Sequence, residues 1–296
     1  MNAASRFFDL SGRTKLRATG ADRVRFLNGQ TTNDVRKAGP DATQESCVLN
    51  SKGHLDAHIF LFAKANEIWI DADAELRERL QGRLERYIIA DDVVVEDASE
   101  GFALFHVLAE AKPAVEAKFH VRSRRLGWDG WDLWVEAAAV KEATEALTSA
   151  YQTADENEWE RLRIENGIPR WGRELTPDII PPEANLAERA IDYEKGCYIG
   201  QEVISRMKIS GQLRQRLRGL ASEGALLPGM ELHVEEKVVG RITSAVFSSR
   251  TNSNIGLAMI KRGHNDIGSS LLASNQKVKA NVRVVTLPLK GGLAGC

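Results

Sequence analysis

The stretch KGCYIGQE, from Lys195 to Glu202, places one cysteine where its thiol could react. The residues that follow can form a helix, with Val203 and Met207 one turn apart, so Cys197 would lie just before a helix N-terminus. The partial positive charge there, together with Lys195, would favour the thiolate form. The alternative is a buried structural cysteine, a common fate for this residue type. No second cysteine lies at C-x-x-C spacing, so no self-contained metal or iron–sulfur site is expected here.

A second polar pattern lies in HLDAHIFLF, where His54, Asp56 and His58 alternate. In a strand these residues share one face, with neighbours about 6.6 Å apart at about 3.3 Å rise per residue. Such a face could clasp a metal or form an acid–base cluster if a third ligand converged on it. The sequence does not show where that ligand would come from. The alternative is a polar edge that faces water or a ligand cavity.

The elements that must position these residues are of mixed type. Helical periodicity is clearest over 74–90, where Leu76, Leu80, Leu84, Tyr87 and Ile88 fall on one face. Strands and helices do not alternate regularly, which favours an α+β fold over a doubly wound sheet. From Leu213 onward, short β-rich runs separated by Gly, Asn and Ser predict a small β-barrel or sandwich. The other predicted elements are strands at 14–20, 67–73, 91–98 and 102–109, two strands around a turn at 51–53, helices at 21–35, 140–151 and 156–167, and a loop at 168–182.

Composition sets broad limits on the protein class. The 296 residues are 43% hydrophobic and 27% charged with a net charge of −1, as expected for a globular chain of about two domains. No global field favours nucleic acid or lipid, so direct nucleic-acid or membrane binding is not expected. Three scattered cysteines, Cys47, Cys197 and Cys296, indicate a reducing compartment, and we expect the cytoplasm. A local basic run, Arg206, Lys208, Arg214, Arg216 and Arg218, is either a solvated face or a patch for a polyglutamate tail, RNA or an acidic protein.

The stretch around Cys197 resembles the signature of the YgfZ family of folate-binding proteins: Lys-Gly-Cys, an aromatic residue, any residue, then Gly-Gln-Glu. Four further stretches support this resemblance in the order in which the family shows them: NGQTTNDV, VLNSKGHLDAH, RIENGIPRWGREL and PPEANL. The family is related to the glycine-cleavage T protein, an aminomethyltransferase, and to mitochondrial factors for late iron–sulfur assembly.

The resemblance implies a fold and a ligand. It predicts a three-domain ring around a central channel that holds tetrahydrofolate or a derivative. Residues 1–212 would form two interleaved α+β folate-binding domains, and residues 213–296 a C-terminal β-barrel. It also implies a role in maintaining or repairing iron–sulfur enzymes, including tRNA-modifying ones, so the expected partners are folate and iron–sulfur client enzymes or assembly proteins.

The same resemblance assigns site residues. Cys197 and Lys195 would form the working thiol site. A carboxylate can accept two N–H bonds from the edge of a pterin, and Glu165 matches the glutamate that does so in T proteins. Arg173 either meets a carboxylate of the folate tail or is merely exposed. Gln201, at the end of the signature, is also expected to contact folate.

One departure from the T proteins concerns their chemistry. The resemblance places His58 where those enzymes carry an aspartate beside the reactive part of folate, and Asp56 lies one pleat earlier. Because neutral imidazole cannot supply a fixed negative charge beside a developing cation, we do not expect glycine-cleavage aminomethyl transfer. The predicted function is a folate-binding accessory protein for iron–sulfur enzymes. The alternatives are a folate-dependent aminomethyltransferase or demethylase, and a module that carries folate without chemistry.

Overall fold

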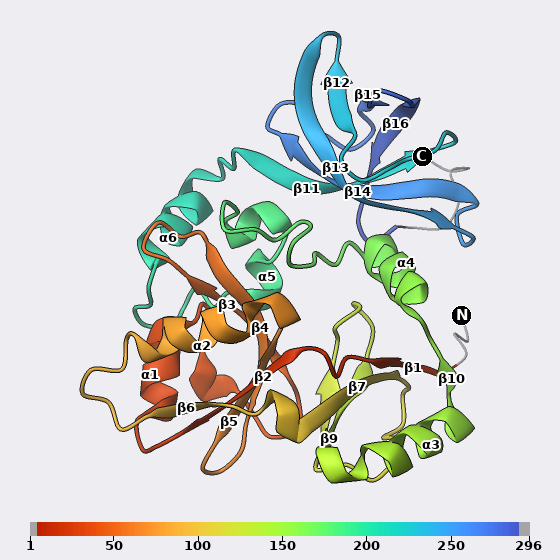
Figure 1. The fold of residues 1–296 in the computed structure, drawn as a ribbon. Coiled ribbons are helices and arrows are strands. Elements are labelled where there is room, and N and C mark those ends of the chain that lie inside the picture. Colours follow the sequence, from red (N-terminus) through yellow and green to blue (C-terminus); the bar gives the residue numbers. More distant parts are fainter. Residues whose placement is uncertain (1–4, 290–296) are drawn as a thin grey trace. The chain divides into compact units, whose positions relative to one another are not determined.

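The computed structural model describes residues 5–289, which leaves Cys296 outside the described part. The chain divides into two compact units, each made of two stretches (Figure 1). Unit 1 comprises residues 1–155 and 187–205, and unit 2 comprises residues 156–186 and 206–296. Both units combine helices with antiparallel strands, which confirms the α+β prediction.

Unit 1 contains two five-stranded sheets, which we call sheet A and sheet B. Sheet A has the order β10-β1-β7-β9-β8, and its strands are β10 Gln152–Thr153, β1 Arg6–Asp9, β7 Phe102–Leu108, β9 Gly130–Glu136 and β8 Phe119–Ser123. Sheet B has the order β3-β4-β5-β2-β6, and its strands are β3 Gln44–Leu49, β4 Leu55–Ala63, β5 Ile68–Ala72, β2 Thr14–Thr19 and β6 Val94–Asp97. Apart from the parallel pair β1 and β10, neighbouring strands run antiparallel.

Aromatic side chains from both sheets form one buried cluster. Trp69 of sheet B and Trp134 of sheet A are 3% and 1% exposed, and their ring centroids lie 5.5 Å apart in an edge-to-face arrangement. Phe62 of β4 also meets Trp134, at 5.4 Å. Edge-to-face pairs add to the free energy of burial because ring edges are positive and ring faces negative. This cluster therefore holds the two sheets together.

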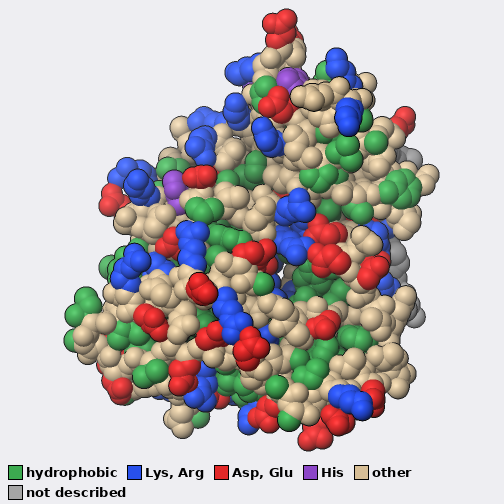
Figure 2. All heavy atoms as spheres, in the orientation of Figure 1, with side chains coloured by type: hydrophobic (Ala, Val, Ile, Leu, Met, Phe, Trp, Pro, Cys, Tyr) green, Lys and Arg blue, Asp and Glu red, His purple; other side chains and the backbone are tan. Residues whose placement is uncertain are grey.

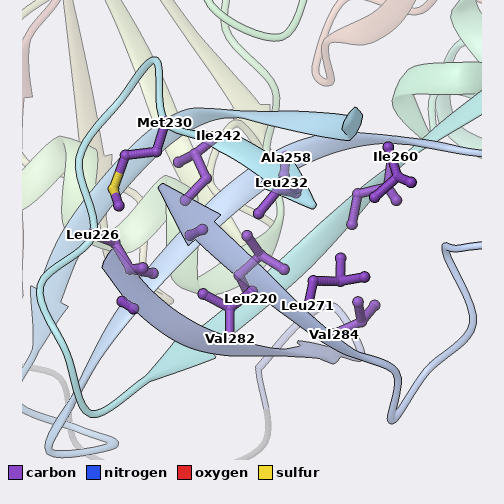
Figure 3. Packing of buried hydrophobic residues seen from close by; sticks show 13 residues of the cluster. Leu220, Leu226, Met230, Leu232, Ile242, Ala258, Ile260, Leu271, Val282 and Val284 are labelled. Carbon is purple, nitrogen blue, oxygen red and sulfur yellow. The ribbon is translucent and has the colours of Figure 1, made fainter. Parts of the chain in front are cut away.

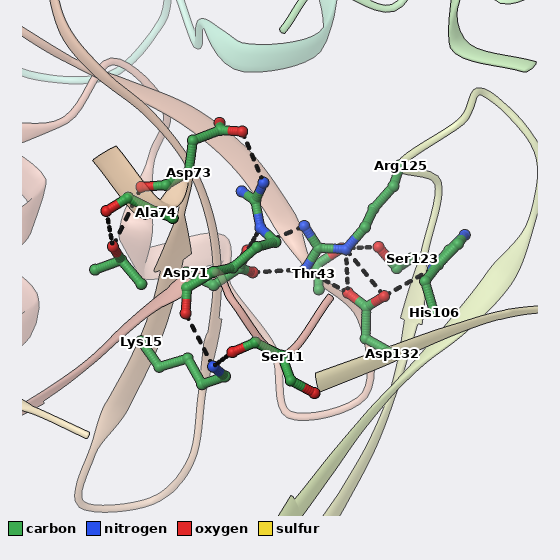
Figure 4. Close-up of polar contacts among 12 residues, drawn as sticks. Ser11, Lys15, Thr43, Asp71, Asp73, Ala74, His106, Ser123, Arg125 and Asp132 are labelled. Atoms are coloured by element: carbon green, nitrogen blue, oxygen red, sulfur yellow. Dashed lines mark hydrogen bonds and ion pairs between the residues drawn. The ribbon is translucent and has the colours of Figure 1, made fainter. Parts of the chain in front are cut away.

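A buried guanidinium forms a second link between the sheets (Figure 4). Arg125 donates to Asp71 of β5 at 3.0 Å and to Asp132 of β9 at 2.9 Å. The Cζ atom of its guanidinium group lies 4.3 Å from the centroid of the Phe60 ring. Burial alone would lower the pKa of Arg125, but the two carboxylates outweigh it and hold that pKa above its usual value. His106 completes the network by bonding Asp132 through Nδ1 at 2.8 Å.

The helices of unit 1 pack at the edges and faces of these sheets. In α3 the side chains of Ala143 and Leu147 are buried against sheet A, as the amphipathic pattern predicts. α2 packs against β2 and β6 of sheet B. The helices are α1 Arg23–Gln30, α2 Arg77–Glu85, α3 Val140–Ala150 and α5 Ala187–Ala190, and α6 Gln201–Ser210 begins in this unit.

The predicted helix over 74–90 is wrong at its C-terminal end. α2 stops at Glu85, and Tyr87, expected on the buried face, is 40% exposed. Two tight turns follow the helix, with Tyr87 N–H bonded to the Leu84 carbonyl and Ile88 N–H to that of Glu85. The chain is then anchored at Asp92, whose carbonyl accepts from the Asp22 N–H, so tertiary contacts override the local periodicity.

Unit 2 contains the predicted C-terminal barrel, which is closed by six antiparallel strands in the order β11-β14-β13-β12-β15-β16 (Figure 3). Aliphatic side chains such as Leu220, Ile242 and Val282 fill its interior. Outside the barrel, Ile164 of α4 (Glu156–Asn166) packs on Leu217 and Leu257. The strands are β11 Gln215–Ser222, β12 Glu231–Val234, β13 Lys237–Ser248, β14 Ser253–Lys261, β15 Ser270–Ser274 and β16 Lys279–Val285.

Replacing Arg125 with methionine tests the link between the sheets. The substitution leaves Asp71 and Asp132 buried without their shared cation, so we expect a loss of about 3–5 kcal/mol in the free energy of unfolding. The adjacent Arg124, whose side chain is 71% exposed, serves as the matched control. Arg124→Met should change stability by less than about 0.5 kcal/mol. Equal effects of the two substitutions in urea unfolding would contradict the assignment.

Candidate functional site

The segment that carries Cys197 docks on residues more than 150 positions earlier in the sequence: the last turn of α1 and the chain that follows it, together called the 28–33 loop. The N–H of Asp192 bonds to the Thr32 carbonyl at 3.1 Å, and the N–H of Ile199 bonds to that of Gly29 at 3.2 Å. Thr32 returns a bond from its hydroxyl to the Ala190 carbonyl at 2.6 Å. The stretches NGQTTNDV and KGCYIGQE are therefore direct neighbours in unit 1. We call residues 195–200 the signature loop.

Lys195 anchors the signature loop from inside. Its side chain is directed at the 28–33 loop, where the ammonium donates to the carbonyls of Asn28, Thr31 and Asn33 at 2.7, 2.6 and 2.8 Å. Lys195 is 5% exposed, and burial lowers its pKa to about 8, although Asp34 and Asp192 oppose the shift. An ammonium has three N–H donors, and all three are used here. Lys195 therefore positions the loop, and its charge is held by backbone oxygens.

Two glycines allow the signature loop to pack against the β3–β4 turn. Gly200 has φ +85° and Gly53 has φ +76°, a region that side chains disfavour. A Cβ at Gly200 would lie 2.7 Å from the Asn50 carbonyl oxygen, and a Cβ at Gly53 would lie 2.9 Å from Cβ of Val203. The backbones approach closely because neither residue has a side chain. This contact brings VLNSKGHLDAH beside the signature loop.

The structure distinguishes Cys197 from Cys47, the other described cysteine. Cys197 is exposed, whereas Cys47 is fully buried in β3. Burial raises the pKa of the Cys47 thiol far above its usual value, and the negative charge of Glu45 adds to the effect. α6 begins at Gln201, so three residues separate Cys197 from the first helical residue. Cys197 thus lies on a rigidly held loop and is open to other molecules.

His58 lies in a buried ion-pair cluster that the sequence analysis did not foresee. Its Nε2 is 2.8 Å from Oε1 of Glu45 on the neighbouring β3, and Glu45 also accepts two bonds from Arg189 of α5, at 2.9 and 2.8 Å. Burial alone would raise the pKa of Glu45, but Arg189 and His58 lower it to about 2. His58 is 4% exposed, so this part of β4 is not a polar edge facing water.

Asp56 does not join His58. A β-bulge between Val48 and Leu49 shifts the register opposite Asp56, and its carboxylate accepts from Arg83 of α2 at 2.9 Å. His54 precedes β4 and bonds through its backbone to Asn50. Within residues 5–289 no group of three or more His, Cys, Asp or Glu side chains is arranged to hold a metal ion.

Glu165 lies in unit 2, near the end of α4, and is 1% exposed. Its Oε1 accepts from the Ser248 hydroxyl at 2.6 Å and from Arg161 at 3.1 Å, while Arg250 Nε lies 3.2 Å from Oε2. The Nε and Nη2 atoms of Arg250 are buried and form no hydrogen bond in the described part of the chain, although Nε is ion-paired with Glu165. Buried donors are usually satisfied, so Nη2 is a spare donor for a polar ligand at this corner of unit 2.

Two predicted site residues, Arg173 and Gln201, are not buried. Arg173 is exposed in the proline-rich loop of unit 2, and Gln201 is half-buried as the first residue of α6. Cys197, Lys195 and Gln201 thus share one short segment of unit 1, with His58 and Asp56 on β4, whereas Glu165 and Arg173 belong to unit 2. The prediction that these residues form a functional site stays a prediction.

Sequence reasoning missed three residues: Glu45, Arg189 and Arg250. The hairpin around the turn at 51–53 was predicted, and its antiparallel register pairs Glu45 with Phe60, diagonally from His58. That register could have identified Glu45. No local pattern pointed to Arg189 or Arg250, since both reach their partners through tertiary contacts.

Comparison with known proteins agrees with this fold. Residues 215–290 match the glycine cleavage T-protein C-terminal barrel domain. The crystal structure of the glycine cleavage system aminomethyltransferase T from Bartonella henselae superposes with a TM-score of 0.86 at 18% identity, covering 97% of this chain and 86% of that one. The fold is therefore that of the T proteins, an α+β fold with a C-terminal β-barrel.

Two curated relatives refine the comparison. An aminomethyltransferase from Mycobacterium avium is 31% identical over 307 residues, covering 93% of this chain and 81% of the relative. The tRNA-modifying protein YgfZ from Yersinia pestis is 26% identical over 227 residues, covering 71% of this chain and 69% of the relative. The chain belongs to the aminomethyltransferase family, that of the glycine cleavage T protein.

None of the helices in residues 5–289 is long and apolar enough to cross a membrane.

Two glycines of the signature loop offer a matched test of its docking. Gly200→Ala should lower the melting temperature by several degrees, because the new Cβ would collide with Asn50 and the positive φ would be strained. A Cβ at Gly196 would meet nothing within 4 Å, so Gly196→Ala should leave the melting temperature nearly unchanged. Thermal unfolding followed by circular dichroism measures both. A larger loss in the Gly196 variant would refute the packing described here.

Proposed function

We propose that this protein is a tetrahydrofolate-binding accessory protein that supports the assembly or repair of iron–sulfur enzymes, with Cys197 as its working thiol. The observation that carries the proposal is the contrast between an exposed Cys197 on an anchored loop and a buried Cys47. A structural cysteine packs into the core, whereas a reacting one must meet its partner. The YgfZ-like signature around Cys197 supports this role. On this view the protein works in the cytoplasm.

The fixed position of the loop also supports a chemical role. Three buried hydrogen bonds from Lys195 and two backbone bonds to the 28–33 loop hold the residues on either side of the thiol. Positioned groups react more effectively than mobile ones, because the ordering entropy is already lost. Among the relatives, the Yersinia pestis protein is named as tRNA-modifying, which is consistent with clients that include tRNA-modifying iron–sulfur enzymes.

The residues around Glu165 suit a pterin. The unpartnered Nη2 of Arg250 can donate to a ring oxygen or nitrogen acceptor, and Oε2 of Glu165, which is ion-paired with Arg250 Nε, can accept from the amino edge. Because Oε1 already accepts from Ser248 and Arg161, bidentate recognition would require one of these two donors to yield. We therefore propose Glu165 and Arg250 as the pterin contacts. Arg173 and Gln201 remain proposed contacts elsewhere on the ligand, and the division at 212/213 remains the proposed domain boundary.

The second candidate is a folate-dependent aminomethyltransferase or demethylase, which membership of the family favours. The environment of His58 argues against glycine-cleavage aminomethyl transfer. Two carboxylates lie near this part of β4, but Arg189 holds Glu45 and Arg83 holds Asp56. Neither leaves an uncompensated negative charge for a developing cation. We propose that the protein does not catalyse that reaction.

Folate binding is tested by calorimetry with tetrahydrofolate. Glu165→Ala and Arg250→Met should each weaken binding by about tenfold or more, since a lost charge-assisted bond costs roughly 1.5–3 kcal/mol. The control is Glu231→Ala, an exposed carboxylate on β12 of the same unit, which should bind like the wild type. Unchanged affinity in both site variants would remove the pterin assignment. A wild type that binds no folate would remove the ligand from the proposal.

The thiol is tested by complementation of a strain that lacks its own version of the protein, with the activity of an iron–sulfur enzyme as the readout. Cys197→Ser should lose rescue, because a hydroxyl is a far weaker nucleophile and metal ligand than a thiolate. Cys47→Ala is the control and should retain rescue. In the native protein, iodoacetamide should modify Cys197 and leave Cys47 intact until unfolding. Full rescue by Cys197→Ser would end the working-thiol proposal.

A further inference from the structure

Three arginines line one face at the start of the first barrel strand. Arg216 and Arg218 belong to β11, and Arg214 directly precedes it. Alternate residues of a strand share a face, so successive arginine side chains leave the backbone about 6.6 Å apart. Arg216 and Arg218 pair with the core residues Ile260 and Ala258 of β14. Paired residues share a face, so the arginine row lies on the inner face of the sheet, at one end of the barrel. We call these three residues the arginine row.

The buried arginines of the described chain, Arg125 and Arg163, pair with carboxylates, but the half-buried Arg216 and Arg218 do not. Arg216 makes no hydrogen bond or ion pair with the described residues, and Arg218 donates to a neutral acceptor, the Asn265 carbonyl, at 2.7 Å. Arg214 reaches Glu183 only at 3.8 Å, and its side chain is 71% exposed. The row therefore carries positive charge that the fold does not neutralise.

Neighbouring residues add to this charge. The N–H of Arg262 bonds to the Arg214 carbonyl at 3.0 Å, and the Arg262 side chain donates to the side-chain oxygen of Gln212, a neutral acceptor. Burial lowers the pKa of Arg218, the nearby Arg216 lowers it further, and Asp266 opposes the shift. Lys and Arg side chains also gather over the barrel at the top of Figure 2. Like charges held together at partial burial are costly, and an anion bound between them would relieve that cost.

The surroundings indicate which anion suits the row. An extended polypeptide presents alternate side chains at about the same 6.6 Å spacing, and each guanidinium can bind a carboxylate with two parallel bonds. An exposed apolar side chain lies close by: Ile267 is 49% exposed in the loop that receives Arg218. It would contact an apolar residue between the acidic ones.

Single-stranded nucleic acid fits this surface less well. Its binding sites combine cations with aromatic side chains on which bases stack. In the described part of unit 2, the exposed aromatic residue is Phe247, near the C-terminal end of β13. The part of β13 beside the arginine row is around Gly240, which pairs with Ile260, so Phe247 lies away from the row. We propose that the arginine row docks an acidic segment of a partner protein, with glutamate or aspartate at alternating positions and apolar residues between them. This surface does not depend on the proposed folate or thiol functions.

The test measures fluorescence anisotropy of a fluorescein-labelled peptide of alternating glutamate and leucine, titrated with the full chain. The wild type should bind it, with affinity falling steeply between about 0.05 and 0.2 M salt. Arg216→Gln and Arg214→Gln should each weaken binding about tenfold. The matched control is Arg241→Gln, since Arg241 is a 65% exposed arginine on β13 of the same barrel, and it should bind within about twofold of the wild type.

Control ligands and the unfolding measurement can overturn the proposal. A peptide with lysine in place of glutamate should not bind. Labelled oligouridylate should bind more weakly than the acidic peptide, and tighter binding that depends on the same arginines would assign the surface to RNA instead. No binding by the wild type, or equal loss in the Arg241 variant, would refute the docking surface. Thermal unfolding checks that each variant is folded. Arg214→Gln is the variant least prone to misfolding, because the Arg214 side chain projects into solvent.

Discussion

A buried ammonium determines where the cysteine of this protein can lie. Lys195 is enclosed in unit 1, and its three donors meet three carbonyls of the 28–33 loop. A charge of this kind is costly to bury unless every donor is satisfied, so the loop and the signature segment can adopt few other arrangements together. Gly200 and Gly53 then set the distance between the backbones. Cys197 is exposed because the residues on either side of it are held in this way.

Two other clusters of unit 1 follow the same rule, that a buried charge must be satisfied by its neighbours. Arg125 lies between Asp71 and Asp132, and Glu45 lies between His58 and Arg189. In each cluster the opposite charge outweighs the penalty of burial, which is why the pKa of Glu45 falls although desolvation opposes it. Closed clusters of this kind stabilise the position of strands. They leave little uncompensated charge around β4.

Two regions of unit 2 depart from this rule. Arg250 has a buried Nη2 without a hydrogen-bond partner beside Glu165, and Arg216 and Arg218 of the arginine row form no ion pair in the described part of the chain. A folded chain tolerates such groups at a cost in stability, and binding of a ligand can recover that cost. We therefore place the proposed pterin contacts and the proposed protein contact at these two regions. Their residues do not overlap, so each can be tested while the other is intact.

The sequence by itself determined the fold class, the barrel and the hairpin around Gly53. These features depend on local signals, strand alternation and turn glycines, each readable within a few residues. The end of α2, the burial of His58 and the partners of Asp56, Glu165 and Lys195 were decided only by the tertiary structure. Each depends on which distant residue satisfies a buried charge or a backbone group, such as Arg189 for Glu45 or Arg83 for Asp56. Local propensity contributes tenths of a kcal/mol per residue, whereas an unsatisfied buried group costs about 1–3 kcal/mol, so the long-range contacts prevail.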